Sequence, residues 1–510
     1  MCSTFRHEPR LHRGRSLETL GAVELGKTPP ERVVMILCPT PPRGSPWLCA
    51  LLLLGAWAPD ALAVRPNIIY IMADDLGTGD IGPYGQKKIA TPHLDRLAAT
   101  GTCFDQFYSG ASVCSPTRSA LMTGQHTGHT PIRGNHGMAG VQRVPLPAAA
   151  ITVAEVLRSA GYATALSGKW GLGEPGNEGI PNRQGFDRFL GYLNNNHAEF
   201  HFPETVWRNE TEVPIPGNAA GLRGQYSSDF LTDEAVAFIA DHRTRPFFLF
   251  LAYTAPHARL EAPDDAIAAY SGAFAEPTDT TEAGKNATPA PFATYAAMVT
   301  RLDHGVGRVL DQLRDLGLEE NTVVFFCSDN GVPDRVGIPQ FFGSTQGRRG
   351  FKGSLWEGGL RAPMIVRWPG RVPAGRRSDF VWAGWDFLPT AAALAGVRPP
   401  PNLDGLDVTP ALLGEHRPRP GHLYWENVQN RFAQAVRVGD LKAVRLSPDA
   451  PVEVYDLRVD HAETKNLAAS HPAFVARAAE LFRTARTASE HWPVATAPDA
   501  GSGDPNHDTK

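Results

Sequence analysis

Residues 67–73 read Asn67-Ile68-Ile69-Tyr70-Ile71-Met72-Ala73, and this apolar stretch ends abruptly at Asp74-Asp75. Three later stretches lead to polar groups in the same way: residues 162–166 to Gly168-Lys169, 247–253 to Pro256-His257, and 322–327 to Ser328-Asp329-Asn330. Near-continuous apolar runs are typical of strands buried on both faces of a parallel sheet. Helical periodicity separates them, over residues 152–160, 229–240 and 293–316. The alternation predicts an α/β sandwich with a largely parallel central sheet, whose polar groups share one site beyond the carboxyl ends of the strands.

Two of these predicted strands end in a pair of oxygen-bearing side chains, Asp74 with Asp75 and Asp329 with Asn330. Three carboxylates and one amide carbonyl form a hard-oxygen site that suits Ca²⁺, with Mg²⁺ as the alternative, better than zinc. Without a cation, three converging carboxylates would repel one another. Each pair alone is also typical of helix caps and turns, so the predicted metal site depends on the two pairs lying together.

A second motif is Cys114-Ser115-Pro116-Thr117-Arg118, followed by a predicted helix over residues 117–122 that Gly124 ends. Pro116 suits a first helical turn, so Cys114 is expected just before the helix N-terminus. Free N–H groups there favour an anion. Arg118, one turn on, adds a forked cation that matches tetrahedral oxyanions. The alternative interpretation is a buried cysteine at a helix start.

The Cys114 motif resembles the maturation signature of the type I (formylglycine-dependent) sulfatase family, C-x-P-x-R followed by an apolar residue and Thr-Gly. Four further segments are similar to that family in the same order: residues 66–77, 91–98, 328–331 and 350–363. Residues 455–468 look like its C-terminal subdomain. The resemblance implies an alkaline-phosphatase-like fold and an arylsulfatase-like enzyme that hydrolyses sulfuric esters of aryl or carbohydrate compounds.

The resemblance also implies how the nucleophile and the metal are held. Cys114, oxidised to formylglycine by a formylglycine-generating enzyme during maturation, would be both nucleophile and metal ligand. The other metal ligands would be Asp74, Asp75, Asp329 and Asn330. The hydrated aldehyde would attack sulfur, and the resulting sulfated hemiacetal would collapse to release sulfate.

Four more residues receive roles from the resemblance. Arg118 would hold the formylglycine hydrate, and Lys169 and Lys352 would grip the sulfate oxygens. His257 would give a proton to the leaving oxygen or bind the sulfate. Charge stabilisation on the equatorial oxygens and a proton for the leaving group are what such an ester needs.

One position departs from the family pattern. Many sulfatases carry histidine in K-W-H-L-G, whereas Lys169-Trp170 is followed here by Gly171. Either another base serves or the sulfated hemiacetal turns over slowly, and the candidate bases are the nearby histidines His126, His129, His136 and His197. The long connection over residues 194–216 predicts part of the substrate pocket, with His197 and His201 as candidate substrate-binding residues.

The chain has 510 residues and a net charge of −4, which predicts no nucleic-acid partner. Residues 1–63 read as a signal region, with the true start at Met35 and cleavage after Ala63. A secreted or periplasmic protein without a stable membrane anchor is therefore expected. Residues 64–418 form the predicted catalytic domain, 419–492 a small C-terminal subdomain with an antiparallel sheet and a helix, and 493–510 a disordered tail.

Two rival functions stay open at this point. A formylglycine-dependent phosphonate or phosphodiester hydrolase is one, because such a site also accepts phosphoryl centres. A catalytically silent sulfated-glycan binder is the other, and Gly171 favours it. The expected partner of the enzyme is a sulfated small molecule or glycan. Cys103 and Cys327 are expected to be free thiols, with a bridge between them as the alternative.

Overall fold

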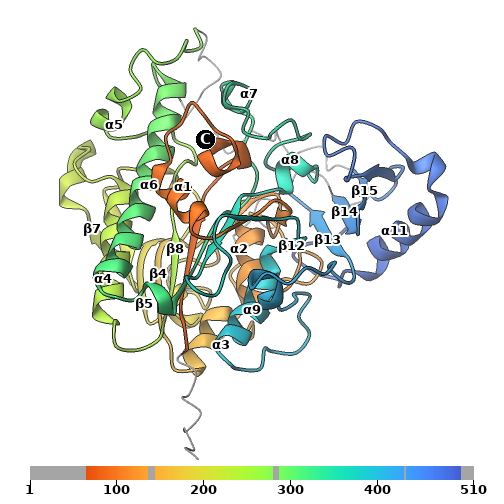
Figure 1. Ribbon diagram of the computed structural model, residues 1–510, viewed down its shortest axis with the longest axis horizontal. Helices are drawn as coiled ribbons and strands as arrows, with labels where there is room; N and C mark the ends of the chain where they lie inside the picture. The colour runs from red at the N-terminus through yellow and green to blue at the C-terminus, as the bar shows by residue number, and fades with distance from the viewer. Residues whose placement is uncertain (1–64, 136–143, 279–286, 430–431, 495–510) are drawn as a thin grey trace, which may run out of the picture. The chain divides into compact units, whose positions relative to one another are not determined.

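The computed structural model describes residues 65–135, 144–278, 287–429 and 432–494. Within these ranges the chain forms a ten-stranded, a two-stranded and a four-stranded sheet (Figure 1). The order of the large sheet is β11 (Arg376–Ser378), β2 (Thr102–Phe104), β10 (Met364–Arg367), β9 (Thr322–Ser328), β1 (Asn67–Ala73), β8 (Phe247–Ala252), β4 (Ala163–Lys169), β5 (Arg188–Tyr192), β6 (Thr205–Arg208) and β7 (Thr211–Pro214). The two-stranded sheet pairs β3 (Phe107–Tyr108) with β12 (Trp382–Ala383).

The middle of the large sheet is parallel. β1 lies between β8 and β9, so that Tyr70 is opposite Phe250 on one side and Phe325 on the other. β4 is parallel to β8, and β5 is parallel to β4. All residues of β1, β4, β8 and β9 are buried, which explains why these stretches of sequence are almost continuously apolar.

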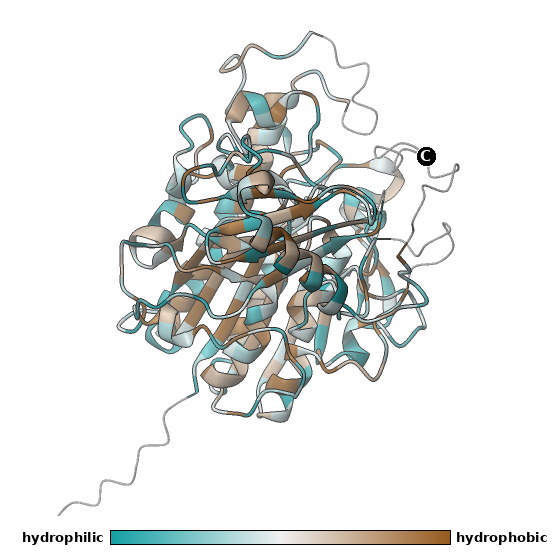
Figure 2. Cartoon of the chain, turned by 90° about the vertical axis from the view of Figure 1, so that its right-hand side faces the viewer, coloured by the Kyte–Doolittle hydropathy of each residue, from teal (hydrophilic) through white to brown (hydrophobic). Residues whose placement is uncertain are grey.

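Helices cover both faces of this sheet, and alternate side chains of β1 divide the core between them. Ile69 and Ile71 belong to one apolar cluster, whereas Ile68 and Tyr70 belong to the other. The first face carries α1 (Pro92–Ala99), α4 (Ser227–Asp241) and α6 (Pro291–Asp315); the second carries α2 (Cys114–Thr123), α3 (Val153–Ser159) and α9 (Phe387–Leu394). Figure 2 shows the apolar strands, in brown, enclosed by these helices. Four shorter helices are α5 (Asp264–Ala268), α7 (Ile338–Phe342), α8 (Glu357–Leu360) and α10 (Thr409–Leu412).

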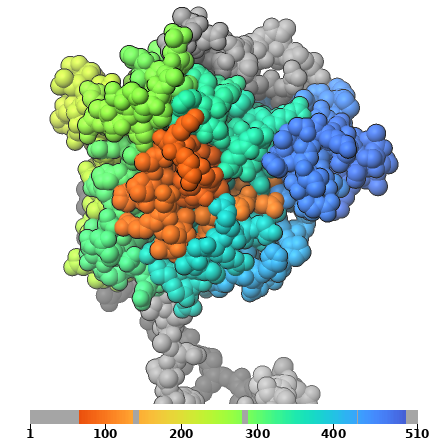
Figure 3. Space-filling model, turned by 45° about the horizontal axis from the view of Figure 1, so that its top comes forward, coloured from red at the N-terminus to blue at the C-terminus, as the bar shows by residue number. Residues whose placement is uncertain are grey.

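The C-terminal residues form a separate antiparallel sheet, in the order β13 (Leu423–Asn427), β14 (Ala433–Val438), β15 (Leu441–Arg445) and β16 (Glu453–Asp456). The helix α11 (Pro472–Thr484) packs on it through Ala478 and Phe482. Figure 3 shows these blue residues gathered beside the blue-green residues that precede β10. The predicted fold class, a largely parallel sandwich with a small antiparallel sheet and a helix, is confirmed.

Two local predictions differ from the structure. The connection over residues 194–216 contains the β6–β7 hairpin, which extends the sheet with antiparallel strands. Strands of four residues carry too little pattern to be recognised, although Asn209, at φ 54 in the turn, is a residue that tolerates this left-handed conformation. The helix predicted over residues 117–122 begins earlier, so that Cys114 lies inside its first turn rather than before it.

The described cysteines are free thiols. Cys103 packs in the apolar cluster on one face of the sheet, and Cys327 packs in the cluster on the opposite face. The sheet between them accounts for the absence of the alternative bridge. Within the described ranges, no helix has both the length and the apolar character needed to cross a membrane.

Candidate active site

The predicted polar residues meet at one edge of the sheet. β9, β1, β8 and β4 are adjacent strands, and all four run in the same direction. Their carboxyl ends therefore lie side by side and present Asp329, Asp74, His257 and Lys169 to a common space. The first turn of α2 adds Cys114 and Arg118, and the loop before α8 adds Lys352. We call this group, together with Asp75 and Asn330, the reaction centre.

Asp74 contacts three members of the reaction centre. Its Oδ2 lies 2.5 Å from Lys169 Nζ and 3.7 Å from Arg118 Nη2. Its Oδ1 lies 3.5 Å from Cys114 Sγ. Arg118 also donates to Asp329 Oδ2 at 3.1 Å and to the carbonyl of Lys169 at 2.6 Å. The cysteine thus lies among two fixed cations and a carboxylate.

Asp75 contacts the remaining members. Lys352 Nζ is 2.8 Å from Oδ1, and His257 Nε2 is 3.5 Å from Oδ2. Asn330 Nδ2 donates to Oδ1 at 2.7 Å, and the backbone N–H of Asp75 donates to Asp329 Oδ1 at 3.1 Å. With φ at 68, Asp75 adopts the left-handed turn that lets two consecutive carboxylates enter one site.

Burial and neighbouring charges set the protonation of the reaction centre. Burial alone would raise the pKa of Asp74, but the surrounding cations, Lys169 above all, hold the pKa well below its ordinary value. Burial, together with the charge of Asp74, raises the pKa of Asp329 to about 7. Burial raises the pKa of the Cys114 thiol and lowers the pKa of His257 to about 3. Crowded carboxylates of this kind are relieved by a bound cation.

The donor atoms fit a divalent metal ion. Ligand atoms of Asp74, Asp75, Cys114 and His257 all lie within 4.8 Å of one another. In the part of the chain that the structure describes, Asn330 Oδ1 is buried and accepts no hydrogen bond. A buried oxygen without a partner is rare unless an ion or water uses it. Carboxylate and amide oxygens are the ligands of Ca²⁺ and Mg²⁺.

The position of the missing histidine is occupied by another side chain. Gly171 has φ 80, and a Cβ added to it would lie 3.0 Å from Asn195 Oδ1 and 3.4 Å from Ser115 Oγ. Asn195 Nδ2 donates to Ser115 Oγ at 2.9 Å, and Ser115 Oγ donates to the Gly171 carbonyl at 2.8 Å. Asn195 and Gly171 are therefore linked through Ser115, in the first turn of α2. The sequence predicts Asn195 only as part of the 194–216 connection, because nothing in the run of three asparagines at 194–196 singles out the middle one.

Of the substitute bases proposed from the sequence, His126 and His129 lie past the far end of α2 from Cys114. His129 Nδ1 is 2.9 Å from Asp404 Oδ1, and His126 stacks on His129 beyond the C-terminus of α2. Ten helical residues, about 15 Å, separate them from Cys114. His197 packs edge-on against the ring of Tyr192 at 5.0 Å. His136 lies outside the described residues.

His201 contacts the backbone of the loop that carries His257, and a substrate-binding role does not require this contact. Its side chain is fully buried, and Nε2 lies 3.2 Å from the carbonyl oxygen of His257. This contact supports the loop that carries His257. Arg335, which sequence reasoning did not single out, donates from Nη2 to the Pro256 carbonyl and supports the same loop. A single arginine in a loop has no pattern that would reveal this.

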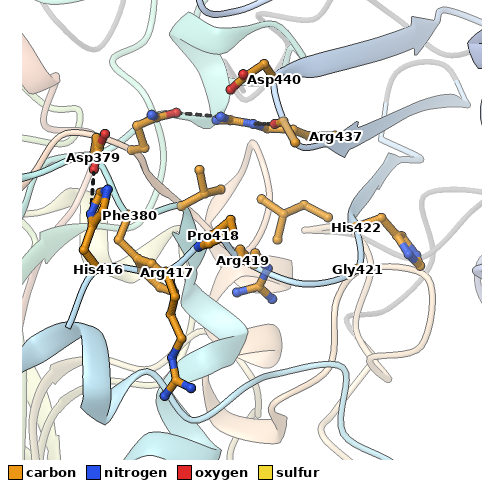
Figure 4. Close-up of a pocket in the computed structure, with 14 residues that line it drawn as sticks. Asp379, Phe380, His416, Arg417, Pro418, Arg419, Gly421, His422, Arg437 and Asp440 are labelled. Atoms are coloured by element: carbon orange, nitrogen blue, oxygen red, sulfur yellow. Dashed lines mark hydrogen bonds and ion pairs between the residues drawn. The ribbon is translucent and has the colours of Figure 1, made fainter.

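A pocket of about 240 Å³ lies apart from the reaction centre, beside the C-terminal sheet (Figure 4). Two of its three arginines are engaged in hydrogen bonds: Arg419 bonds Asp386, and Arg437 bonds Tyr108 and Gln106. No cysteine or serine lies among its lining residues. The reaction centre, with its thiol and clustered carboxylates, is therefore the better candidate for chemistry.

The fold and the reaction centre together define a class of protein: an enzyme with an α/β sandwich fold that hydrolyses esters of tetrahedral oxyanions. The comparisons make this specific. A family model described as Sulfatase matches residues 66–397, and one described as N-sulphoglucosamine sulphohydrolase, C-terminal, matches residues 350–483.

Relatives and solved structures agree with these models. Arylsulfatase A of Homo sapiens is 37% identical over 429 residues, which cover 77% of this chain and 77% of that protein. N-acetylgalactosamine-6-sulfatase of Canis lupus familiaris is 35% identical over 393 residues, covering 72% and 70%. The crystal structure of Ps i-CgsB in complex with k-i-k-neocarrahexaose matches with a TM-score of 0.70 at 30% identity, covering 85% of this chain and 95% of that one.

The chain belongs to the sulfatase family. Its fold is the alkaline-phosphatase-like sandwich, and it is a sulfuric ester hydrolase. The family uses a metal ion and a formylglycine, and the buried acidic residues with Cys114 could hold such an ion. The predictions of family, fold and reaction type are confirmed.

Proposed function

We propose that this chain hydrolyses sulfate esters of carbohydrates, with Cys114 as the residue converted to formylglycine. The observation that carries the proposal is the position of Cys114 Sγ, 3.5 Å from Asp74 and in the same buried group as Arg118 and Lys169. The carbohydrate substrate is supported by two relatives. One is an N-acetylgalactosamine-6-sulfatase, and the other was solved in complex with k-i-k-neocarrahexaose.

The charges of the reaction centre favour an anionic substrate once a metal is bound. Three aspartates are balanced by Arg118, Lys169 and Lys352. A divalent ion held by Asp74, Asp75, Asp329 and Asn330 would leave two positive charges in excess, which attract a sulfate ester. When present, the formylglycine hydrate supplies the nucleophile, and the metal lowers its pKa. We assign Lys169 and Lys352 to the sulfate oxygens and Arg118 to the hydrate, as the family motifs imply.

His257 is oriented toward the reaction centre by its own backbone. Nδ1–H donates to the Ala258 carbonyl at 2.8 Å, which leaves Nε2 facing Asp75. We assign Nε2 to the leaving oxygen, where it would give up a proton as the ester bond breaks. The bound anion would favour the protonated ring that this step needs.

The experiment that tests the proposal combines mass spectrometry with turnover. The peptide containing Cys114 is analysed from protein expressed with a formylglycine-generating enzyme, and sulfate release is measured on aryl and carbohydrate sulfates. A formylglycine mass with sulfate release is expected. An unmodified cysteine without sulfate release would leave a sulfated-glycan binder as the better account. Faster cleavage of an aryl phosphodiester than of an aryl sulfate would favour the phosphodiester hydrolase.

The proposal also covers the bound ion, the localisation and the domain boundaries. We propose Ca²⁺ rather than Mg²⁺ as the bound ion, to be tested by elemental analysis of purified protein. We also propose a secreted or periplasmic protein whose signal region, residues 1–63, precedes a catalytic domain (64–418) and a C-terminal subdomain (419–492). The signal region and the tail from residue 495 lie outside the described residues. N-terminal sequencing of the mature protein tests the cleavage after Ala63.

A further inference from the structure

Two loop segments run side by side next to the reaction centre. The backbone N–H of Arg259 donates to the Glu199 carbonyl at 3.0 Å. His201 Nε2 lies 3.2 Å from the carbonyl oxygen of His257. These two contacts fix residues 199–201 against residues 257–259. Side chains that leave this pair of segments toward solvent are therefore held close to His257, which faces the reacting atoms.

One of those side chains is an exposed aromatic ring. Phe200 is 39% exposed, whereas most phenylalanines of this chain are buried in the sheet core. The Arg259 guanidinium lies 4.3 Å from the centre of the Phe200 ring. Stacking of this kind holds an arginine in one orientation. An exposed ring with a fixed cation on it forms a surface with one apolar and one charged part.

The cation in this pair has unused hydrogen-bonding capacity. Among the described residues, Arg259 Nε is buried and donates to no acceptor. The neighbouring pair of Arg223 and Phe202 offers a contrast. Arg223 stacks on Phe202 at 4.5 Å, but its Nη2 donates to the Ala262 carbonyl at 2.8 Å. Arg223 therefore uses one donor on the backbone, whereas the partly buried Arg259 keeps a donor without an acceptor.

We propose that Phe200 and Arg259 form a subsite that binds a second anionic group on the substrate. The inference rests on the proposed function, because it places this subsite beside the leaving-group side of the same reaction centre. A sugar ring can lie on an exposed aromatic face, and a guanidinium fork matches a sulfate or a carboxylate. The substrate class is therefore a saccharide that carries another sulfate or a uronate in addition to the sulfate that is cleaved.

The test compares three substrates at fixed ionic strength. The first is a monosulfated monosaccharide, the second is the same sugar with another sulfate, and the third is a sulfated disaccharide that contains a uronate. The readout is the ratio of kcat/KM for each doubly anionic substrate to that for the monosulfated one. A ratio of about ten or more is expected for the wild type, because charge-assisted hydrogen bonds are the stronger ones. The second and third substrates show whether sulfate or carboxylate is preferred.

Three variants test whether the preference for doubly anionic substrates, measured as the kcat/KM ratio, depends on this subsite. In Arg259→Gln the ratio is expected to fall close to one, and in Phe200→Leu to an intermediate value, because the arginine loses the ring that orients it. Arg223→Gln is the matched control, since it removes a stacked arginine that bonds the Ala262 carbonyl, and the wild-type ratio is expected to persist. Melting temperatures show whether each variant is folded, and either subsite variant suffices if the other fails to fold.

Two results would overturn the inference while leaving the proposed function intact. One is a wild-type ratio near one for both doubly anionic substrates. The other is a preference that survives in both folded Arg259→Gln and folded Phe200→Leu. Failure of the proposed function looks different, because none of the three saccharides would then release sulfate from protein that carries the formylglycine.

Discussion

Two buried clusters of charged side chains differ in how their carboxylates are arranged, although a residue of one lies only a few positions from a residue of the other. Lys352 belongs to the reaction centre, whereas Glu357 belongs to a second group with Lys442 and Glu463, which we call the Lys442 cluster. Lys442 Nζ lies 3.0 Å from Glu357 Oε1 and 2.9 Å from Glu463 Oε1. All three side chains of this cluster are at most 1% exposed. The cluster joins the loop that carries Lys352 to the C-terminal sheet.

The difference lies in how the carboxylates are arranged. In the Lys442 cluster one lysine separates the two glutamates, and the backbone N–H of Glu357 donates to Glu463 Oε2 at 2.6 Å. Burial would raise the pKa of Glu357, but Lys442 and its neighbours lower it to about 2. Burial and Glu357 raise the pKa of Glu463, just as burial and Asp74 raise the pKa of Asp329 to about 7 in the reaction centre, where three carboxylates converge. Buried ion pairs alone therefore do not mark a catalytic site. Two aspartates, a cysteine and a histidine whose ligand atoms all lie within 4.8 Å of one another are a stronger sign of one.

The largest expected effect is a loss of enzymatic activity without a loss of stability. Cys114→Ala removes the proposed nucleophile but leaves the packing of α2 nearly unchanged, because the residue is a small buried side chain at a helix start. Sulfate release should fall by about 10⁴-fold or more, as when a covalent nucleophile is removed, while the melting temperature changes little. Turnover and thermal unfolding of the same sample measure both. Retention of turnover in this variant would contradict the assignment of Cys114.

The second prediction breaks the Lys442 cluster. Lys442→Met keeps the length of the side chain and leaves Glu357 and Glu463 buried without their shared cation. A loss of about 3–5 kcal/mol in the free energy of unfolding is expected, because breaking a buried ion pair leaves an uncompensated charge. Urea unfolding measures it. Arg458→Met, which removes an exposed ion pair with Asp456 at 3.0 Å, is the control and should cost less than about 1 kcal/mol.

A loss of similar small size in both variants would show that the Lys442 cluster is not the structural element we describe. Conversely, a folded Lys442→Met protein with weakened sulfate binding would show that the cluster also positions Lys352. The binding constant for free sulfate, measured on the metal-loaded protein, distinguishes the two.

The third prediction adds a charge to the reaction centre. Asn330→Asp replaces the amide that donates to Asp75 Oδ1 at 2.7 Å with a fourth carboxylate. In a chelator the variant should be about 3 kcal/mol less stable than the wild type, because a buried like charge is unfavourable. Excess Ca²⁺ should restore most of that loss. Asn402→Asp, at an exposed position, is the control, and equal effects of Ca²⁺ on both variants would argue against a metal at Asn330.

The sequence predicted the parts of the site that depend on local pattern. Asp74 and Asp329 were found because each follows an apolar strand, and parallel strands bring their carboxyl ends together. Lys352 was found only through a motif, since nothing local distinguishes a functional lysine from a surface one. Contacts that depend on loop packing could not be predicted, because no strand or motif fixes where loop side chains lie. The contact of Lys442 with Glu357 and the pairing of Asn195 with Gly171 both depend on how the loops pack after folding.

The smallest expected effect concerns a third buried group, which lies outside both regions. Burial lowers the pKa of His126 to about 3 from an ordinary value of 6.5. Between these pH values the unfolded chain binds a proton that the folded chain does not, so stability rises with pH and falls as pH drops below 6.5. From pH 7 to pH 5 the wild type should lose about 2 kcal/mol through this residue alone. His126→Gln should lose correspondingly less, whereas His242→Gln, at a partly buried histidine after α4, should behave as the wild type does. Urea unfolding at the two pH values checks this, and an equal loss in wild type and His126→Gln would show that acid sensitivity arises in the carboxylate-rich regions instead.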